Sequence, residues 1–215
     1  KFKKYMSKIK IETIKPFGPS IAKVKIPEKI LNDINKYVDK IILDKEKSKN
    51  LDHGDKLAGN VTQEFILDKE FSTKSGWLDF LARATDTWIK EANHRISEFK
   101  LINTWVVRQF SHEYNPAHFH TGHISGAGFL KIPNTFGDTV QKNKKSNKNG
   151  KLQLIHGSRQ FLCKSMYTIT PEVGDFYFFP HYLMHIVYPF HGTNEERRSI
   201  SFNANIDNQI FNNFA

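Results

Sequence analysis

Cysteine is nearly absent from this chain of 215 residues, which carries only Cys163. A single cysteine excludes an internal disulfide and suits a reducing, cytoplasmic environment. The run QFLCKSMYTIT around it has the texture of a strand, so we expect Cys163 to be a buried structural thiol. No apolar run approaches the ~18 residues of a membrane helix, and no stretch near the N-terminus has the form of a secretory signal. We therefore expect a cytoplasmic protein with no membrane partner.

Acidic residues are scarce relative to basic ones, 22 against 32, which gives a formal net charge of +10. Such a balance raises the question of a nucleic-acid partner. The densest lysine cluster, Gln141–Lys151, is rich in Asn, Ser and Gly and contains no aromatic residue that could stack on a base. This composition is typical of a solvated loop. We therefore do not expect nucleic acid to be the partner.

Hydrophobic residues make up 39% of the chain, including 18 Phe, and this is enough for a sizeable core. Pro27 stands where a first helical turn would begin. Apolar residues then recur with the helical period at Ile30, Leu31, Ile34, Tyr37, Val38, Ile41 and Ile42. A second helix is predicted from about Ser75 to Phe99. Both apolar stripes are interpreted as core packing.

The residue pattern of the sequence changes at Leu101. Short β-branched or aromatic runs follow one another, punctuated by Gly, Pro and Asn, and no helical period reappears. This pattern predicts about eight antiparallel strands in a jelly-roll. The expected fold is therefore α+β, mainly β. Residues 1–100 are predicted to be a helical and extended support region and residues 101–215 the β core, within one structural domain.

Three histidines lie within six residues, at His118, His120 and His123. On a strand, His118 and His120 would point to one face, and Phe119 to the other. Imidazole is a favoured ligand of divalent transition metals. The pair alone is a weak signal, because surface histidine pairs are common.

The second half of the chain adds further candidates. In PEVGDFYFFPHYLMHIVYPF a strand enters a turn, and His185 on the returning strand could supply a third ligand from across a small barrel. In RRSISFNAN, Arg197 and Ser199 alternate onto one face. An arginine followed by a hydroxyl can bind a carboxylate with several hydrogen bonds. The alternative is a strand with one polar, solvent-facing side.

Four blocks of the sequence, HFH, SGAGFL, GDFYFFPHYLMH and RRSISFN, together resemble those of iron(II)/2-oxoglutarate-dependent dioxygenases. They are most similar to the 2-oxoglutarate–iron(II) oxygenase family of phages and bacteria, which is related to prolyl hydroxylases. The resemblance covers roughly Leu101 to Ile206. It implies a double-stranded β-helix, the jelly-roll of this superfamily, with iron(II) at its mouth.

The resemblance also implies roles for individual residues. His118 and His185 would be metal ligands, and Arg197 and Ser199 would hold the distal carboxylate of 2-oxoglutarate, whose 2-oxo acid end would chelate the metal. The reaction would consume O2, release succinate and CO2, and hydroxylate a C–H bond. The substrate would be a protein or peptide residue, as for prolyl hydroxylases, or a small metabolite.

Two positions depart from the family pattern. Most members carry Asp or Glu where this chain has His120, so the implied metal site is a triad of His118, His120 and His185, with His123 as the neighbouring alternative third ligand. Relatives often carry Tyr where this chain has Phe129. Lys131, two residues later, is therefore a second candidate for binding the co-substrate, after Arg197.

Two other functions remain open from the sequence. A cupin-like metalloprotein shares the barrel, but its expected glutamate and asparagine are replaced by Ile124 or Ser125 and by Pro189. A non-catalytic basic binding module is suggested only by charge. The high content of Lys, Asn and Ile is typical of an AT-rich genome and is compatible with a phage protein in the host cytoplasm.

Overall fold

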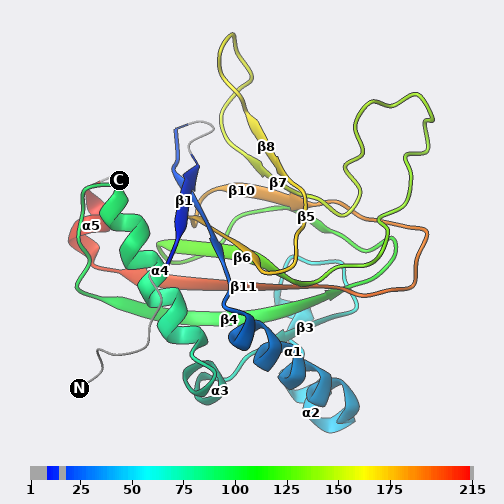
Figure 1. Ribbon diagram of the computed structural model, residues 1–215, viewed down its shortest axis with the longest axis horizontal. Helices are drawn as coiled ribbons and strands as arrows, with labels where there is room; N and C mark the ends of the chain where they lie inside the picture. The colour runs from blue at the N-terminus through cyan, green and yellow to red at the C-terminus, as the bar shows by residue number, and fades with distance from the viewer. Residues whose placement is uncertain (1–8, 15–17, 214–215) are drawn as a thin grey trace.

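The computed structural model describes residues 9–14 and 18–213, which form two antiparallel β-sheets and a set of short helices (Figure 1). The helices are α1 (Glu28–Leu43), α2 (Lys45–Leu51), α3 (Lys69–Lys74), α4 (Trp77–Glu91) and α5 (Asn208–Asn212), with a 3-10 turn η1 at Gly54–Lys56. None of these helices is long and apolar enough to cross a membrane.

The large sheet has the strand order β1-β2-β9-β6-β11-β4-β3. Its strands are β1 (Ile11–Ile14), β2 (Ile21–Lys25), β3 (Gln63–Ile66), β4 (Phe99–Gln109), β6 (Ile124–Lys131), β9 (Asp175–Pro180) and β11 (Arg197–Ile206). The small sheet has the order β5-β10-β7-β8, with β5 (Asn115–His118), β7 (Leu152–Ile155), β8 (Met166–Ile169) and β10 (Met184–Val187). The non-consecutive neighbours are those of a jelly-roll, so the predicted fold class is confirmed.

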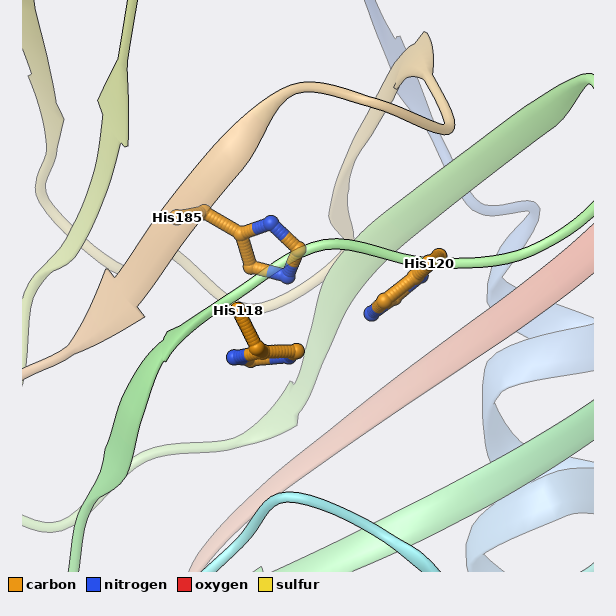
Figure 2. A group of neighbouring side chains, drawn as sticks. All are labelled: His118, His120 and His185. Atoms are coloured by element: carbon orange, nitrogen blue, oxygen red, sulfur yellow. The ribbon is translucent and has the colours of Figure 1, made fainter.

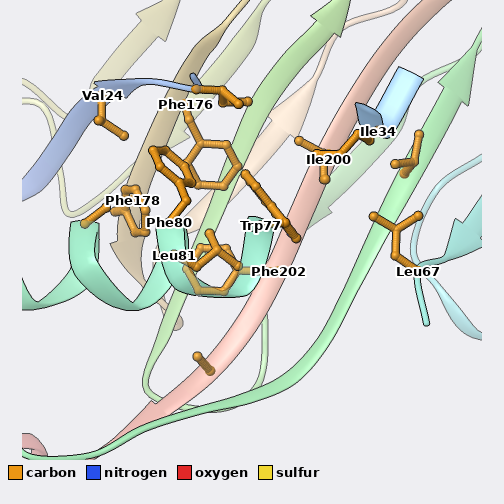
Figure 3. Close-up of a cluster of buried hydrophobic side chains, with 14 of the residues drawn as sticks. Val24, Ile34, Leu67, Trp77, Phe80, Leu81, Phe176, Phe178, Ile200 and Phe202 are labelled. Atoms are coloured by element: carbon orange, nitrogen blue, oxygen red, sulfur yellow. The ribbon is translucent and has the colours of Figure 1, made fainter. Parts of the chain in front are cut away.

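Helices α1 and α4 cover the outer face of the large sheet (Figures 1 and 3). The side chains of Trp77 and Phe80 on α4 pack against Phe176 of β9, with ring centroids 5.4 and 6.5 Å away. Trp77 also donates its indole N–H to Thr104 Oγ1 at 3.1 Å, which satisfies a buried polar group. The predicted apolar stripes are buried at Ile34, Val38 and Ile41 of α1 and at Leu81 and Trp88 of α4. Trp77 and Phe80 were not part of the predicted stripe of the second helix.

A second apolar cluster lies between the two sheets. It contains Ile21, Phe129, Leu152, Leu154, Ile169, Tyr177, Phe179 and Leu183. Alternation along β9 divides its aromatic residues between the two cores, because Phe176 and Phe178 join the helix-covered cluster while Tyr177 and Phe179 join the inner one. The inner face of the large sheet is thus apolar at this end and leaves room for a cavity at the other.

Two expectations about local structure are wrong. The second helix ends at Glu91, because Asn93 takes a left-handed conformation (φ 62°) and Phe99 already begins β4. Cys163 is exposed, since it lies in the tip between β7 and β8, next to Phe161 and Leu162, whose relative exposures are 93% and 92%. The apolar run around Cys163 looked like a strand but forms a solvated hairpin tip.

The division of the chain at residue 100 remains a prediction. The large sheet takes β1, β2 and β3 from the first hundred residues and its central strands from the rest. The N-terminal region therefore contributes sheet edges as well as helices.

Candidate metal centre and co-substrate pocket

A cavity of about 360 Å³ opens between the two sheets at the end where β4 and β3 form the sheet edge. Its floor is the inner face of the large sheet, and its opposite wall is formed by β5 and β10. The size falls at the lower end of the roughly 300–1,000 Å³ that ligand pockets occupy. The polar residues that line it include His118, His120, His185, Arg197, Ser199, Ser201, Asn203, Asn103, Asn115 and Glu64.

The structure brings His118, His120 and His185 together (Figure 2). His118 and His185 are partners on the adjacent strands β5 and β10, and their ring centroids lie 4.2 Å apart. His120 lies 4.7 Å from His185 and 5.3 Å from His118 by the same measure. One ring nitrogen of each histidine lies within 4.8 Å of those of the other two.

The two histidines of the HFH segment converge for a different reason from the one predicted. Strand β5 ends at His118, so simple alternation along a strand does not place His120. Instead, the backbone N–H of His120 donates to the carbonyl of His181 at 2.9 Å. This bond anchors the segment after β5 to the turn that precedes β10, and it directs the ring toward His185.

Burial keeps the three imidazoles neutral. It lowers the pKa of His120 to about 2 and that of His185 to about 3, with a further contribution in each case from the neighbouring histidines. The pKa of His118 is also lowered by burial. Only a neutral imidazole has a lone pair for a metal, so the site is ready for a cation at neutral pH.

Hydrogen bonds orient two of these rings. The Nδ1 atom of His118 lies 2.7 Å from the carbonyl of Pro116, and that of His185 lies 2.9 Å from the carbonyl of Leu183. An Nδ1–H donated to a carbonyl leaves Nε2 with its lone pair free, as in metal-binding histidines. His120 has a buried Nδ1 without a hydrogen-bond partner. Three neutral nitrogen donors of this kind fit a divalent transition metal such as iron(II).

Arg197 lies in the same cavity and has no counter-ion among the residues that the structure describes. It is 1% exposed, donates to Gln109 Oε1 at 3.0 Å and Ser199 Oγ at 3.4 Å, and stacks over the ring of Phe129 at 5.2 Å. Its Nε atom is buried without a partner, and no carboxylate in the described part of the chain pairs with it. Burial lowers its pKa to about 10, which still leaves it charged at neutral pH. The arrangement fits a bound carboxylate.

The two reserve candidates lie elsewhere. The ring of His123 stacks on Phe211 at 3.9 Å, and its Nδ1 accepts the backbone N–H of Ile206 at 3.2 Å. Lys131 is exposed and does not line the cavity. Neither residue therefore reaches the three histidines or Arg197.

Sequence reasoning missed Glu64 and Asn115, which line the cavity, and Gln109, which accepts a hydrogen bond from Arg197. Glu64 reaches the cavity only because β3 pairs with β4, which begins more than thirty residues later in the chain (Gln63–Ile66 against Phe99–Gln109). The segment QEFI contains no motif, so no local signal would have identified it.

A family model described as "Putative 2OG-Fe(II) oxygenase" matches residues 103–203. No curated protein sequence is similar enough to the chain to match it.

Solved structures with the same fold include a prolyl-4-hydroxylase of Pseudomonas putida, with 11% identity, coverage of 85% of this chain and 91% of that one, and a TM-score of 0.56. A prolyl hydroxylase of Trichoplax adhaerens, in complex with a hypoxia-inducible-factor peptide, has 11% identity, covers 91% and 87%, and has a TM-score of 0.51. HygX of Streptomyces hygroscopicus, with nickel, 2-oxoglutarate and hygromycin B, has 10% identity, covers 85% and 81%, and has a TM-score of 0.52.

Proposed function

We propose that His118, His120 and His185 hold iron(II) in this chain. Residues 103–203 match the model of the 2OG-Fe(II) oxygenase family. The chain is an iron(II)- and 2-oxoglutarate-dependent dioxygenase. We further propose that Arg197 and Ser199 bind the distal carboxylate of 2-oxoglutarate. The observation that carries this assignment is one cavity that contains both three convergent neutral imidazoles and a buried arginine without a counter-ion.

The residues of this chain bind and orient the reactants. The chemistry supplied by bound iron(II) is the reaction of O2 with 2-oxoglutarate and a substrate C–H bond, which gives succinate, CO2 and an alcohol. Arg197 neutralises one carboxylate of the co-substrate, and Ser199 adds a hydrogen bond. Gln109 holds the guanidinium in place at 3.0 Å, and Phe129 lies against it and excludes water.

The third ligand distinguishes this site from the usual two histidines and one carboxylate. With His120 in place of a carboxylate, the ligand set carries no negative charge. The low pKa of each buried histidine partly offsets this loss, because protons compete for the nitrogens only under acidic conditions.

The substrate is proposed to be a protein or peptide residue, as for the prolyl hydroxylases among the structural neighbours, with a small metabolite as the second possibility. A bound peptide in one neighbour and bound hygromycin B in another support both classes for this fold. The exposed ring of Phe119 and the segment Lys56–Ala58 line the cavity and frame its mouth. We propose that the reaction takes place in the cytoplasm, because the chain has a single cysteine. The Lys-, Asn- and Ile-rich composition supports a phage-infected host.

The test is release of succinate from 2-oxoglutarate, followed by NMR, by protein reconstituted with iron(II) in air. We expect turnover that requires iron(II), O2 and 2-oxoglutarate together, slow without the primary substrate and abolished in His185→Ala. Succinate release that persists in His185→Ala would remove this histidine from the metal site. A wild-type protein that binds no iron would leave the cupin-like and binding-module alternatives.

A further inference from the structure

A second buried ionisable group, a carboxyl group, lies in the cavity away from Arg197. Glu64 on β3 is 1% exposed, lines the cavity, and has a buried Oε2 atom without a hydrogen-bond partner. No lysine or arginine in the described part of the chain forms an ion pair with it, and it does not pair with Arg197. A buried carboxyl oxygen without a hydrogen-bond partner is costly unless a ligand satisfies it.

The register of the large sheet fixes where Glu64 lies. Ser199 on β11 pairs with Val107 on β4, and Val107 pairs with Glu64 on β3. Residues in one such row share a face of the sheet, and two strand spacings of about 4.8 Å place the Cα atoms of Ser199 and Glu64 roughly 10 Å apart. The co-substrate end and the Glu64 end of the floor are therefore separate parts of one cavity.

The surroundings of Glu64 hold its carboxyl group in place. Burial, followed by the charge of Asp52, raises the pKa of Glu64 to about 7, whereas a hydrogen bond from the side-chain amide of Asn115 lowers that pKa. A side chain at Gly59 would lie 2.9 Å from Asn115 Nδ2 and 3.0 Å from both oxygens of Glu64. A larger residue at position 59 would therefore displace the ends of the Asn115 and Glu64 side chains.

We propose that Glu64, positioned by Asn115 and Gly59, forms the subsite for the primary substrate, and that this substrate presents an organic cation, an ammonium or guanidinium group, to the carboxylate. The inference rests on the proposed function, because it takes the Arg197 end of the cavity to be the 2-oxoglutarate site. It adds the class of the primary substrate, a lysine- or arginine-like side chain or another amine.

The charge of the two ends favours a cation over a neutral donor. Among the described residues that line the cavity Glu64 is the only acidic one, and the other charged side chains there are those of Arg197 and the exposed Lys56. A charge-assisted hydrogen bond is about twice as strong as a neutral one, and it also removes the cost of an unpaired carboxylate. A neutral amide would recover little of that cost.

The experiment uses the full chain with iron(II) and 2-oxoglutarate under anaerobic conditions. N-acetyl-L-arginine methylamide and N-acetyl-L-lysine methylamide are titrated by calorimetry against the neutral isostere N-acetyl-L-citrulline methylamide. We expect each cation to bind at least tenfold more tightly than the citrulline compound. In Glu64→Gln, which preserves the shape of the side chain, that preference should disappear.

The matched control is Asp55→Asn, which removes an exposed acid from the neighbouring η1 turn and should leave the preference intact. Thermal denaturation of both variants checks that they fold. Equal affinities of the cationic and neutral compounds for the wild type, no detectable binding of any of them, or a preference that survives in Glu64→Gln would each overturn the proposal. Binding of 2-oxoglutarate is measured in the same samples, so failure of the proposed function is recognised separately.

Discussion

The two faces of the large sheet differ in how they treat buried charge. Arg197 and Arg198 are consecutive on β11, each is 1% exposed, and they point to opposite faces. On the outer face, Arg198 donates to Asp39 at 2.7 Å and to Glu196 at 2.8 Å, which ties α1 to the sheet. On the inner face, Arg197 has only neutral partners, Gln109 and Ser199.

Arg197 and Arg198 are therefore equally buried but have different roles. The outer face carries apolar clusters and a paired arginine, and every feature there stabilises the fold. The inner face carries an arginine and a carboxyl group that have no charged partner among the described residues, and neither stabilises the ligand-free protein. The neutral imidazoles face them across the cavity, from β5, β10 and the segment after β5. Groups left unsatisfied within a cavity mark where ligands are expected.

The largest expected effect is at the metal. His185→Ala leaves two of the three imidazoles and should abolish stoichiometric iron(II) binding, measured by anaerobic equilibrium dialysis. The matched control is His181→Ala, since His181 precedes β10 in the same turn and is not one of the three clustered histidines. Full iron content in His185→Ala would show that His185 does not bind the metal.

Next in size is the paired arginine. Arg198→Gln leaves the buried Glu196 with Arg108 alone and releases Asp39 of α1. Loss of one partner from a buried pair costs about 3–5 kcal/mol, and we expect about 3 kcal/mol because Asp39 is itself exposed. Urea denaturation measures it, and 2-oxoglutarate affinity should be unchanged. A loss of co-substrate binding with normal stability would reverse the assignment of the two faces.

The unpaired arginine should give the opposite result. Arg197→Gln removes one charge-assisted contact, so 2-oxoglutarate should bind with about 1.5–3 kcal/mol less free energy, roughly a 10- to 150-fold rise in Kd. The stability of the ligand-free protein should be equal or greater, because an unpaired buried charge has been removed. Unchanged 2-oxoglutarate affinity, measured by calorimetry, would show that another group binds the carboxylate.

The smallest effect concerns pH and the metal-free protein. His120 has a pKa of about 2 in the folded chain, far below the ~6.5 of an unfolded histidine. The unfolded state therefore binds more protons between these values, and stability should fall as pH drops from about 6.5 toward the folded pKa. Each such group contributes up to ~1.4 kcal/mol per pH unit.

This slope is checked by urea denaturation of metal-free wild type and His120→Gln between pH 7 and pH 4.5. The variant should show a shallower decline, since it has lost one of the groups that drives it. Identical slopes in the two proteins would mean that His120 is not held neutral by burial.

Much of this arrangement follows from local sequence patterns. Alternation along RRSISFN placed Arg197 and Ser199 on one face, and the helical period identified the buried face of α1 and part of that of α4. The grouping of His118, His120 and His185 rested on the family resemblance, and their convergence depends partly on the loop bond from His120 to His181. Glu64 depends on the pairing of β3 with β4, which no local pattern encodes. Long-range register is therefore what the sequence did not reveal.

The most direct test of the central claim is an anaerobic titration of metal-stripped protein, first with iron(II) and then with 2-oxoglutarate, followed by visible absorption. We predict one iron per chain and a weak charge-transfer band that develops on addition of 2-oxoglutarate and requires higher co-substrate concentrations in Arg197→Gln but not in Arg198→Gln. Iron that binds without any such band, or a band equally sensitive to both arginines, would contradict the account.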